Sequence, residues 1–248
     1  MRRFASPILL LALISIGASA ESPPTTIQYI ANEGFLIEVG DAKILIDALF
    51  DDRTIAYAHV PDEQTLARMT KAEPPFDDID LILASHSHRD HFSIGPVFER
   101  LSNDPSVVFV GPPQAVKGLR IVASDLEDLM GRVREVDVEL FESAEIEISG
   151  ISIRATLFRH SPYMVTNPET GQEYNRHEGI ENLIYLIEMN GVRLLHVGDA
   201  TLTHNLEFFT GEPFPGGPID IVFLEFFDWS EETKAIVDRW MQPDHVVF

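Results

Sequence analysis

The 248-residue sequence contains no cysteine. It therefore has no disulfide bond, no thiolate nucleophile and no cysteine-ligated zinc or iron–sulfur cluster, and any metal ion must be held by histidine and carboxylate side chains. Positive charge is also scarce, because 18 Lys and Arg stand against 40 Asp and Glu, giving a net charge of −22. Such a chain repels phosphate backbones and anionic lipid headgroups. Nucleic acid and membrane surfaces are therefore poor partners, and we expect a small-molecule substrate; nothing in the sequence indicates an oligomeric state.

The first 20 residues have the pattern of an export signal. Two arginines precede an apolar run over residues 8–16, and Ala18-Ser19-Ala20 supplies the small residues that a signal peptidase reads. The apolar run is shorter than the roughly 20 residues needed to span a bilayer, which favours a removed signal peptide over a membrane anchor. We therefore predict a signal peptide over 1–20, a single domain over 21–248, and a periplasmic or secreted protein.

Hydrophobic periodicity predicts an α/β protein. The predicted helices cover 62–71, 93–101 with Ser93 as its N-cap, and 230–241. The predicted strands cover 27–30, 34–39, 43–46, 80–84, 107–110, 132–138, 145–148, 151–157, 183–188, 192–197, 219–224 and 246–248. We expect strand 132–138 to pair antiparallel with the strands that follow it. Hairpins alternate with strand–helix–strand units, which indicates two mixed β-sheets packed face to face with helices outside.

Three of the nine histidines fall within six positions, in the segment Ser85-His86-Ser87-His88-Arg89-Asp90-His91. This segment directly follows predicted strand 80–84, which is wholly apolar after its first residue. Residues two apart in an extended loop project the same way, so His86 and His88 can converge on one ion, and the turn brings Asp90 and His91 toward a neighbouring point. The pattern predicts two adjacent metal sites.

Two further candidate ligands stand at the ends of other predicted strands. His160 follows strand 151–157, and Asp199 follows strand 192–197 as part of a Gly-Asp pair. A carboxylate such as that of Asp199 can bridge two cations about 3.5–4 Å apart. Imidazole and carboxylate ligands suit Zn²⁺, and also Mn²⁺ or Fe²⁺, so the ligand types leave the metal open, with zinc as the default.

The histidine cluster, the later His160 and the Gly-Asp pair resemble the metallo-β-lactamase superfamily over essentially the whole chain after the predicted signal. Two segments, 33–38 and 44–47, are more similar to the branch with ascorbate-phosphate lactonase-like hydrolases than to the antibiotic-degrading enzymes. The resemblance implies a four-layer αββα sandwich of two mixed β-sheets. It also implies that His86, His88 and His160 hold one metal ion, that Asp90 and His91 hold a second, and that Asp199 lies between them.

The sequence departs from this family at two places. Lactonase-like members have a histidine where Glu33 or Gly34 stands here, so the substrate cannot be carried over. Family members also place a last metal-ligating histidine at the end of the final strand. We expect that position to lie beyond Phe248, in a natural protein that is longer than this chain.

The proposed chemistry is hydrolysis by a metal-bound hydroxide that attacks an ester or lactone, an amide or a phosphoester, with Asp90 orienting the water and moving its proton. Two alternatives stay open, namely an iron-dependent oxidoreductase on the same fold and a metal-binding protein without turnover. Tyr163, Arg176 and His177 are candidate substrate-binding residues. They belong to the segment 161–181, which is either a lid over the metals or a surface loop.

Overall fold

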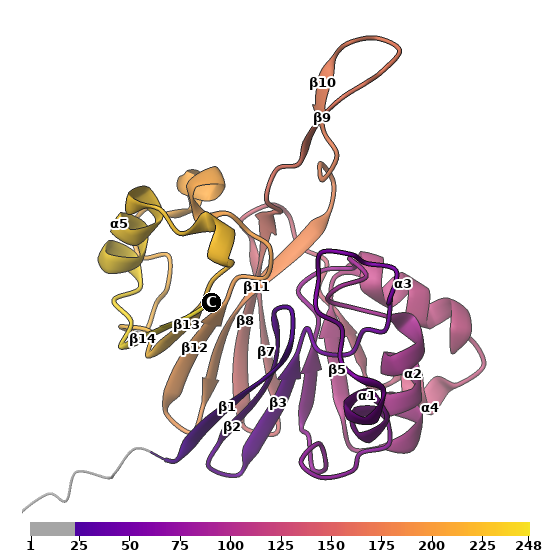
Figure 1. Ribbon diagram of the computed structural model, residues 1–248. Coiled ribbons are helices and arrows are strands. Elements are labelled where there is room, and N and C mark those ends of the chain that lie inside the picture. The colour runs from indigo at the N-terminus through magenta and orange to yellow at the C-terminus, as the bar shows by residue number, and fades with distance from the viewer. Residues whose placement is uncertain (1–22) are drawn as a thin grey trace, which may run out of the picture.

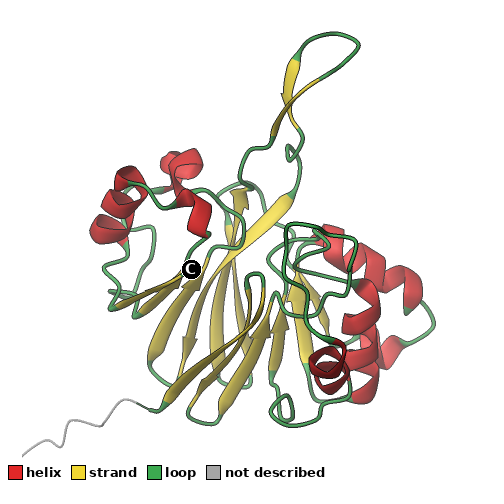
Figure 2. Ribbon diagram, viewed as in Figure 1, coloured by secondary structure: helices red, strands yellow, loops and turns green. Residues whose placement is uncertain are grey.

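The computed structural model describes residues 23–248. Within these residues, two six-stranded β-sheets pack face to face, and helices flank them on both outer sides (Figure 2). This is the predicted αββα arrangement of two mixed sheets. The predicted signal peptide lies outside the described residues.

The first sheet has the strand order β1-β2-β3-β4-β5-β6. Its strands are β1 (Thr25–Ala31), β2 (Gly34–Val39), β3 (Ala42–Ile46), β4 (Leu81–Leu83), β5 (Val108–Gly111) and β6 (Val133–Glu135). The first three strands form an antiparallel meander, and β3 to β6 are parallel. Four helices lie on its outer side: α1 (Glu63–Thr70), α2 (Ile94–Asn103), α3 (Pro113–Val122) and α4 (Glu127–Met130).

The second sheet has the strand order β14-β13-β12-β11-β8-β7. Its strands are β7 (Ser143–Ile148), β8 (Ile151–Arg159), β11 (Glu181–Met189), β12 (Val192–His196), β13 (Ile221–Phe223) and β14 (His245–Val247). Its outer side carries η1 (Leu202–Phe208), η2 (Phe226–Asp228) and α5 (Glu231–Trp240). A small hairpin of β9 (Met164–Thr166) and β10 (Glu173–Asn175) projects away from the body instead of lying across it (Figure 1).

Alternate residues of each strand form the core between the sheets, because successive side chains of a strand point to opposite faces. In β2, Phe35 and Ile37 pack into the core between the sheets, whereas Leu36 points to the opposite face and packs under the helices. A strand buried on both faces is apolar throughout, which is why β4 reads as an unbroken apolar run. The Tyr185 hydroxyl, on β11, donates a hydrogen bond of 2.8 Å to the carbonyl of Ala84, just after β4, and so links the two sheets.

One expectation about local structure is wrong. The strand expected at 132–138 pairs parallel with β5 in the first sheet and not antiparallel with β7, because α3 and α4 form a crossover that returns the chain beside β5. Ser93 occupies the N-cap position of α2, as predicted, although its hydroxyl makes no capping bond and instead accepts a hydrogen bond of 3.2 Å from the Asp51 amide. None of the helices in residues 23–248 is long and apolar enough to cross a membrane.

Candidate metal centre

The histidine cluster follows β4 at the carboxyl end of the parallel strands. The amides of His91 and Phe92 both donate to the carbonyl of His88, at 3.1 and 2.9 Å, which closes a turn just after the two spaced histidines. His86 and His91 are buried, and His88 is partly exposed. The loop therefore presents three imidazoles from one short segment, as the sequence predicts.

The second sheet contributes two residues to the same rim. His160 follows β8, and Asp199 follows β12 through Gly198, which has a φ of +54°. A side chain on Gly198 would place its Cβ 2.6 Å from the Cβ of Ser85, so only glycine allows this loop to approach the histidine loop. The Asp199 amide donates to the buried side chain of Asn182 at 3.2 Å, which fixes the carboxylate at the seam between the sheets.

Four of these residues direct ligand atoms toward one point. One donor atom from each of His86, His88, His160 and Asp199 lies within 4.8 Å of all the others. The Oδ2 atom of Asp199 is 3.4 Å from Nε2 of His160 and 3.8 Å from Nε2 of His86. Nε2 of His160 is 3.1 Å from Nδ1 of His88. The structure thus brings together the three histidines that the resemblance assigns to the first metal and the Asp199 that it places between the two metals.

Asp47 fixes which nitrogen of the neighbouring imidazoles carries hydrogen. Its Oδ2 atom lies 3.1 Å from Nδ1 of His91 and also accepts from the Ser85 hydroxyl, while its Oδ1 atom accepts from the Ser85 amide at 2.7 Å. Because the Ser85 hydroxyl hydrogen is used on Asp47, its oxygen can only accept from Nδ1 of His86, 2.9 Å away. Both imidazoles therefore donate through Nδ1, which leaves Nε2 of each ring facing the site.

The donor set fits a cation. Nε2 of His86 is buried and has no hydrogen-bond partner among the described residues. His160 donates through Nδ1 to the carbonyl of Ser161 at 3.0 Å, so its Nε2 also presents a lone pair. Burial lowers the pKa of His86 well below its usual value and lowers that of His88 to about 4, which keeps both imidazoles neutral. Neutral imidazoles facing one carboxylate are the ligands that a divalent transition metal requires.

A second group of donors shares Asp199 with the first. It consists of Glu33, His91 and Asp199, with one ligand atom from each within 4.8 Å of the others. Nε2 of His91 lies 3.1 Å from Oδ1 of Asp199, so the two carboxylate oxygens face the two groups separately. Burial opposes protonation of His91, but the charges and hydrogen bonds of Asp199 and Asp47 outweigh it and raise the His91 pKa well above its usual value. A proton and a cation would therefore compete for this position.

The second donor group in the structure differs from the expected one at Asp90 and Glu33. Asp90 is buried beside the site, but it is not among the residues whose ligand atoms converge in the second group. Burial raises the pKa of Asp90 and also, together with the Asp199 carboxylate, that of Glu33. In the sequence, Glu33 stands out only as a departure from the family pattern, and nothing there indicates that it is a ligand.

The candidate substrate residues lie at the base of the projecting hairpin. The ring centroid of His177 is 4.3 Å from that of His160 and 4.9 Å from that of His88, so His177 packs directly against the site. Tyr163 is exposed and has its ring 5.4 Å from that of His177. Arg176 is also exposed, and only its backbone, which donates to the Tyr163 carbonyl at 2.8 Å, has a hydrogen bond in the described structure.

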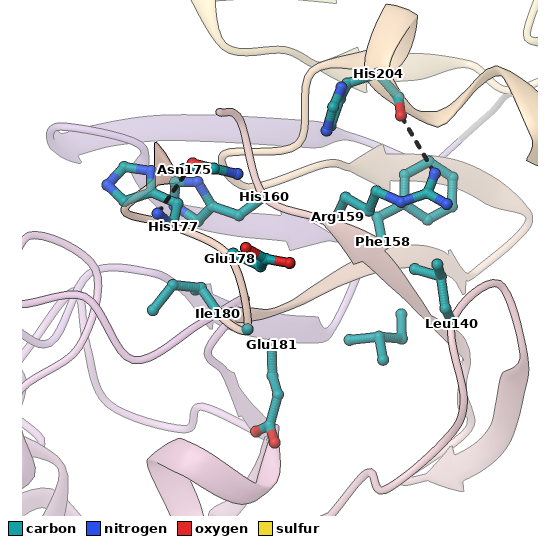
Figure 3. Close-up of a pocket in the computed structure, with 12 residues that line it drawn as sticks. Leu140, Phe158, Arg159, His160, Asn175, His177, Glu178, Ile180, Glu181 and His204 are labelled. Atoms are coloured by element: carbon teal, nitrogen blue, oxygen red, sulfur yellow. Dashed lines mark hydrogen bonds between the residues drawn. The ribbon is translucent and has the colours of Figure 1, made fainter. Parts of the chain in front are cut away.

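A cavity of about 520 Å³ opens beside these residues. His160 and His177 lie at one end of it, and Leu140 and Phe158 lie toward the other (Figure 3). Neither Tyr163 nor Arg176 lines the cavity. Of the three candidate substrate residues, His177 alone thus contacts both the histidine cluster and this cavity.

Comparison with known proteins matches residues 26–226 to a family model described as the beta-lactamase superfamily domain. A metal-dependent hydrolase of the UPF0173 group from Cupriavidus necator is 32% identical over 163 residues, which cover 65% of this chain and 53% of that protein. A UPF0173 metal-dependent hydrolase from Pyrococcus horikoshii is 26% identical over 230 residues, covering 89% of this chain and 82% of that protein. The chain thus spans about half the length of the Cupriavidus relative that it matches.

The solved structure of a possible metal-dependent hydrolase from Veillonella parvula has a TM-score of 0.53 to this structure and 15% sequence identity. The comparison covers 91% of this chain and 85% of that one, and it supports the fold alone. Together with the match to the family model, these likenesses confirm the resemblance found in the sequence. The chain belongs to the beta-lactamase superfamily, and the Cupriavidus and Pyrococcus relatives are named metal-dependent hydrolases.

Proposed function

We propose that this chain is an exported metal-dependent hydrolase that uses two divalent cations, zinc by default, on a small ester or lactone, amide or phosphoester. The observation that carries the proposal is the convergence of three imidazoles and the Asp199 carboxylate, with Nε2 of His86 buried and unpartnered among the described residues. The names of the curated relatives support the reaction class.

His86, His88, His160 and Asp199 would hold one cation, and His91 and Asp199 would contribute to a second. Bound there, the cations would supply Lewis acidity and lower the pKa of water from 15.7 to about 7. Asp47 and Ser85 hold the His86 and His91 rings in the orientation and tautomer that ligation requires.

Asp90 and the cavity supply the remaining parts of the proposed chemistry. Burial raises the pKa of Asp90, so this carboxyl group holds a proton more readily than an exposed aspartate does. Asp90 is therefore suited to moving a proton to a leaving group. The substrate would enter the cavity next to His160 and His177. The volume of the cavity suits a small molecule, and the chain's net charge of −22 opposes binding of a nucleic acid.

Export is proposed from the first 20 residues alone, on their arginines, apolar run and small-residue site. If the signal is cleaved as we propose, the mature protein from its native host begins at Glu21. N-terminal sequencing measures this directly, and retention of the first residues in the mature protein would contradict the proposal.

A panel of lactones, β-lactams, phosphodiesters and acyl-amides tests the reaction class. Protein loaded with Zn²⁺, Mn²⁺ or Fe²⁺ should hydrolyse at least one class, and a chelator should remove that activity. Oxygen consumption by the iron-loaded protein, without hydrolysis of any panel member, would favour the oxidoreductase instead.

The same assay on Asp90→Asn separates proton transfer from metal binding. We expect turnover to fall by about 10²–10⁴-fold, the usual contribution of a positioned acid or base, while metal content falls much less. Inductively coupled plasma mass spectrometry measures the metal content. Equal losses of metal and turnover would show that Asp90 acts as a ligand and not as a proton carrier.

A further inference from the structure

Glu33 lies at the tip of the turn between β1 and β2, next to the metal centre. Two features of the turn fix its position. Asn32 adopts a left-handed conformation with a φ of 48°, and its side-chain amide donates to the carbonyl of Asp90 at 3.2 Å. A Cβ on Gly34 would lie 2.7 Å from the carbonyl oxygen of Asp47 and 2.8 Å from Cα of Ala48, so the turn packs directly on the backbone that follows β3.

The backbone of Glu33 is also held from the second sheet. Nε2 of His196, a buried residue of β12, donates to the Glu33 carbonyl at 3.2 Å, while Nδ1 of the same ring accepts from the Gly198 amide at 3.2 Å. Both nitrogens of His196 are thus used in positioning the two loops. The side chain of Glu33 is presented from a turn that both sheets hold in place.

Negative charge accumulates around Glu33 without a lysine or arginine in the described part of the chain to balance it. The charged groups that act most strongly on Glu33 are Asp199, His91, Glu225 and Asp47, three of which are carboxylates. Within residues 23–248, no lysine or arginine forms an ion pair with Glu33, Asp199 or Glu225. Among the same residues, no group donates a hydrogen bond to the Glu33 carboxylate. Carboxylates packed this closely repel each other unless one of them holds a proton or a cation lies between them.

We propose that Glu33 is a ligand of the second cation, together with His91 and Asp199, and that this carboxylate-rich set accepts a harder ion such as Mn²⁺ beside zinc in the three-histidine site. Carboxylate oxygens suit manganese, whereas imidazoles suit zinc, so the two sites differ in their donor chemistry. The proposal rests on the proposed function only in requiring that the centre binds metal. With Glu33, the second site reaches three protein ligands within the chain described here.

The test is a titration that does not depend on turnover. Metal-free protein receives one equivalent of Zn²⁺ and is then titrated with Mn²⁺, while electron paramagnetic resonance measures the free Mn²⁺. The wild-type chain should bind one Mn²⁺. Glu33→Gln should weaken that binding at least about 10- to 100-fold, the range observed when even an outer partner of a ligand is removed.

Two further variants make the result decisive. Glu147→Gln removes the same charge from an exposed position on β7 and should bind Mn²⁺ as the wild type does. Glu33→His replaces oxygen by nitrogen, so it should take up two Zn²⁺ and bind Mn²⁺ more weakly than the wild type; it decides the question if Glu33→Gln does not fold.

Unchanged Mn²⁺ binding in the Glu33 variants, or no Mn²⁺ binding by the wild type, would overturn the assignment. An intact titration in a protein that hydrolyses nothing would instead count against the proposed reaction alone.

Discussion

Replacing His88 by alanine should lower turnover by at least about a thousandfold and remove bound metal from the three-histidine site. Activation of water and substrate by a cation is worth several kcal/mol, and each 1.4 kcal/mol is about tenfold in rate. The fold should survive, because His88 is partly exposed and is absent from the apolar core clusters. Mass spectrometry of the metal content, together with circular dichroism, measures both effects.

His245→Ala is the matched control for this change. His245 is exposed at the start of β14. Because β12, β13 and β14 are parallel, His245 lies at the opposite end of the sheet from Asp199, which follows β12. We expect it to retain full metal content and turnover. Full metal occupancy in His88→Ala would exclude His88 as a ligand.

Asp47→Asn should weaken both the fold and metal binding, although it changes only one atom. Asparagine tolerates the left-handed φ of 48° at this position, so the backbone is not strained by the change. However, the new NH₂ group would face two donors, the Ser85 hydroxyl and Nδ1 of His91, both in a buried environment. We expect the free energy of unfolding of the metal-free protein to fall by about 3 kcal/mol, and the metal affinity to fall about 10- to 100-fold.

Urea denaturation in the presence of a chelator measures the first effect, and a Zn²⁺ titration measures the second. Asp51→Asn is the control, because Asp51 is exposed and its carboxylate makes no hydrogen bond or ion pair in the described structure. If Asp47→Asn matched this control in both measurements, the role assigned to Asp47 would be wrong.

Local patterns predicted much of the fold and the first donor group. Alternation and apolar runs locate most of the strands, because burial of one or both faces imposes a pattern on each strand by itself. His86 and His88 could be paired because their spacing is a property of one short segment. Helix α3 is absent from the predicted elements, although Pro113 at its first position is a usual signal for a helix start.

The features that could not be predicted depend on packing between distant segments. The alternating pattern of the three residues of β6 would fit a position beside β5 or beside β7. The crossover through α3 and α4 decides which strand is the partner, because it returns the chain beside β5. A glutamate in a hairpin turn is ordinary on its own. Glu33 becomes notable only because the turn at Gly34 packs on the backbone of Asp47 and Ala48, 13 or more positions along the chain.

The donor atoms of the first group come from both sheets, with His86 and His88 following β4 in one and His160 and Asp199 following strands of the other. A bound ion is therefore a crosslink between the two halves of the sandwich, and it exists only in the native state. By mass action, each tenfold rise in free metal above its dissociation constant adds about 1.4 kcal/mol to stability. The melting temperature would therefore follow the free metal concentration of its surroundings, and metal starvation would expose the chain to proteolysis as well as inactivate it.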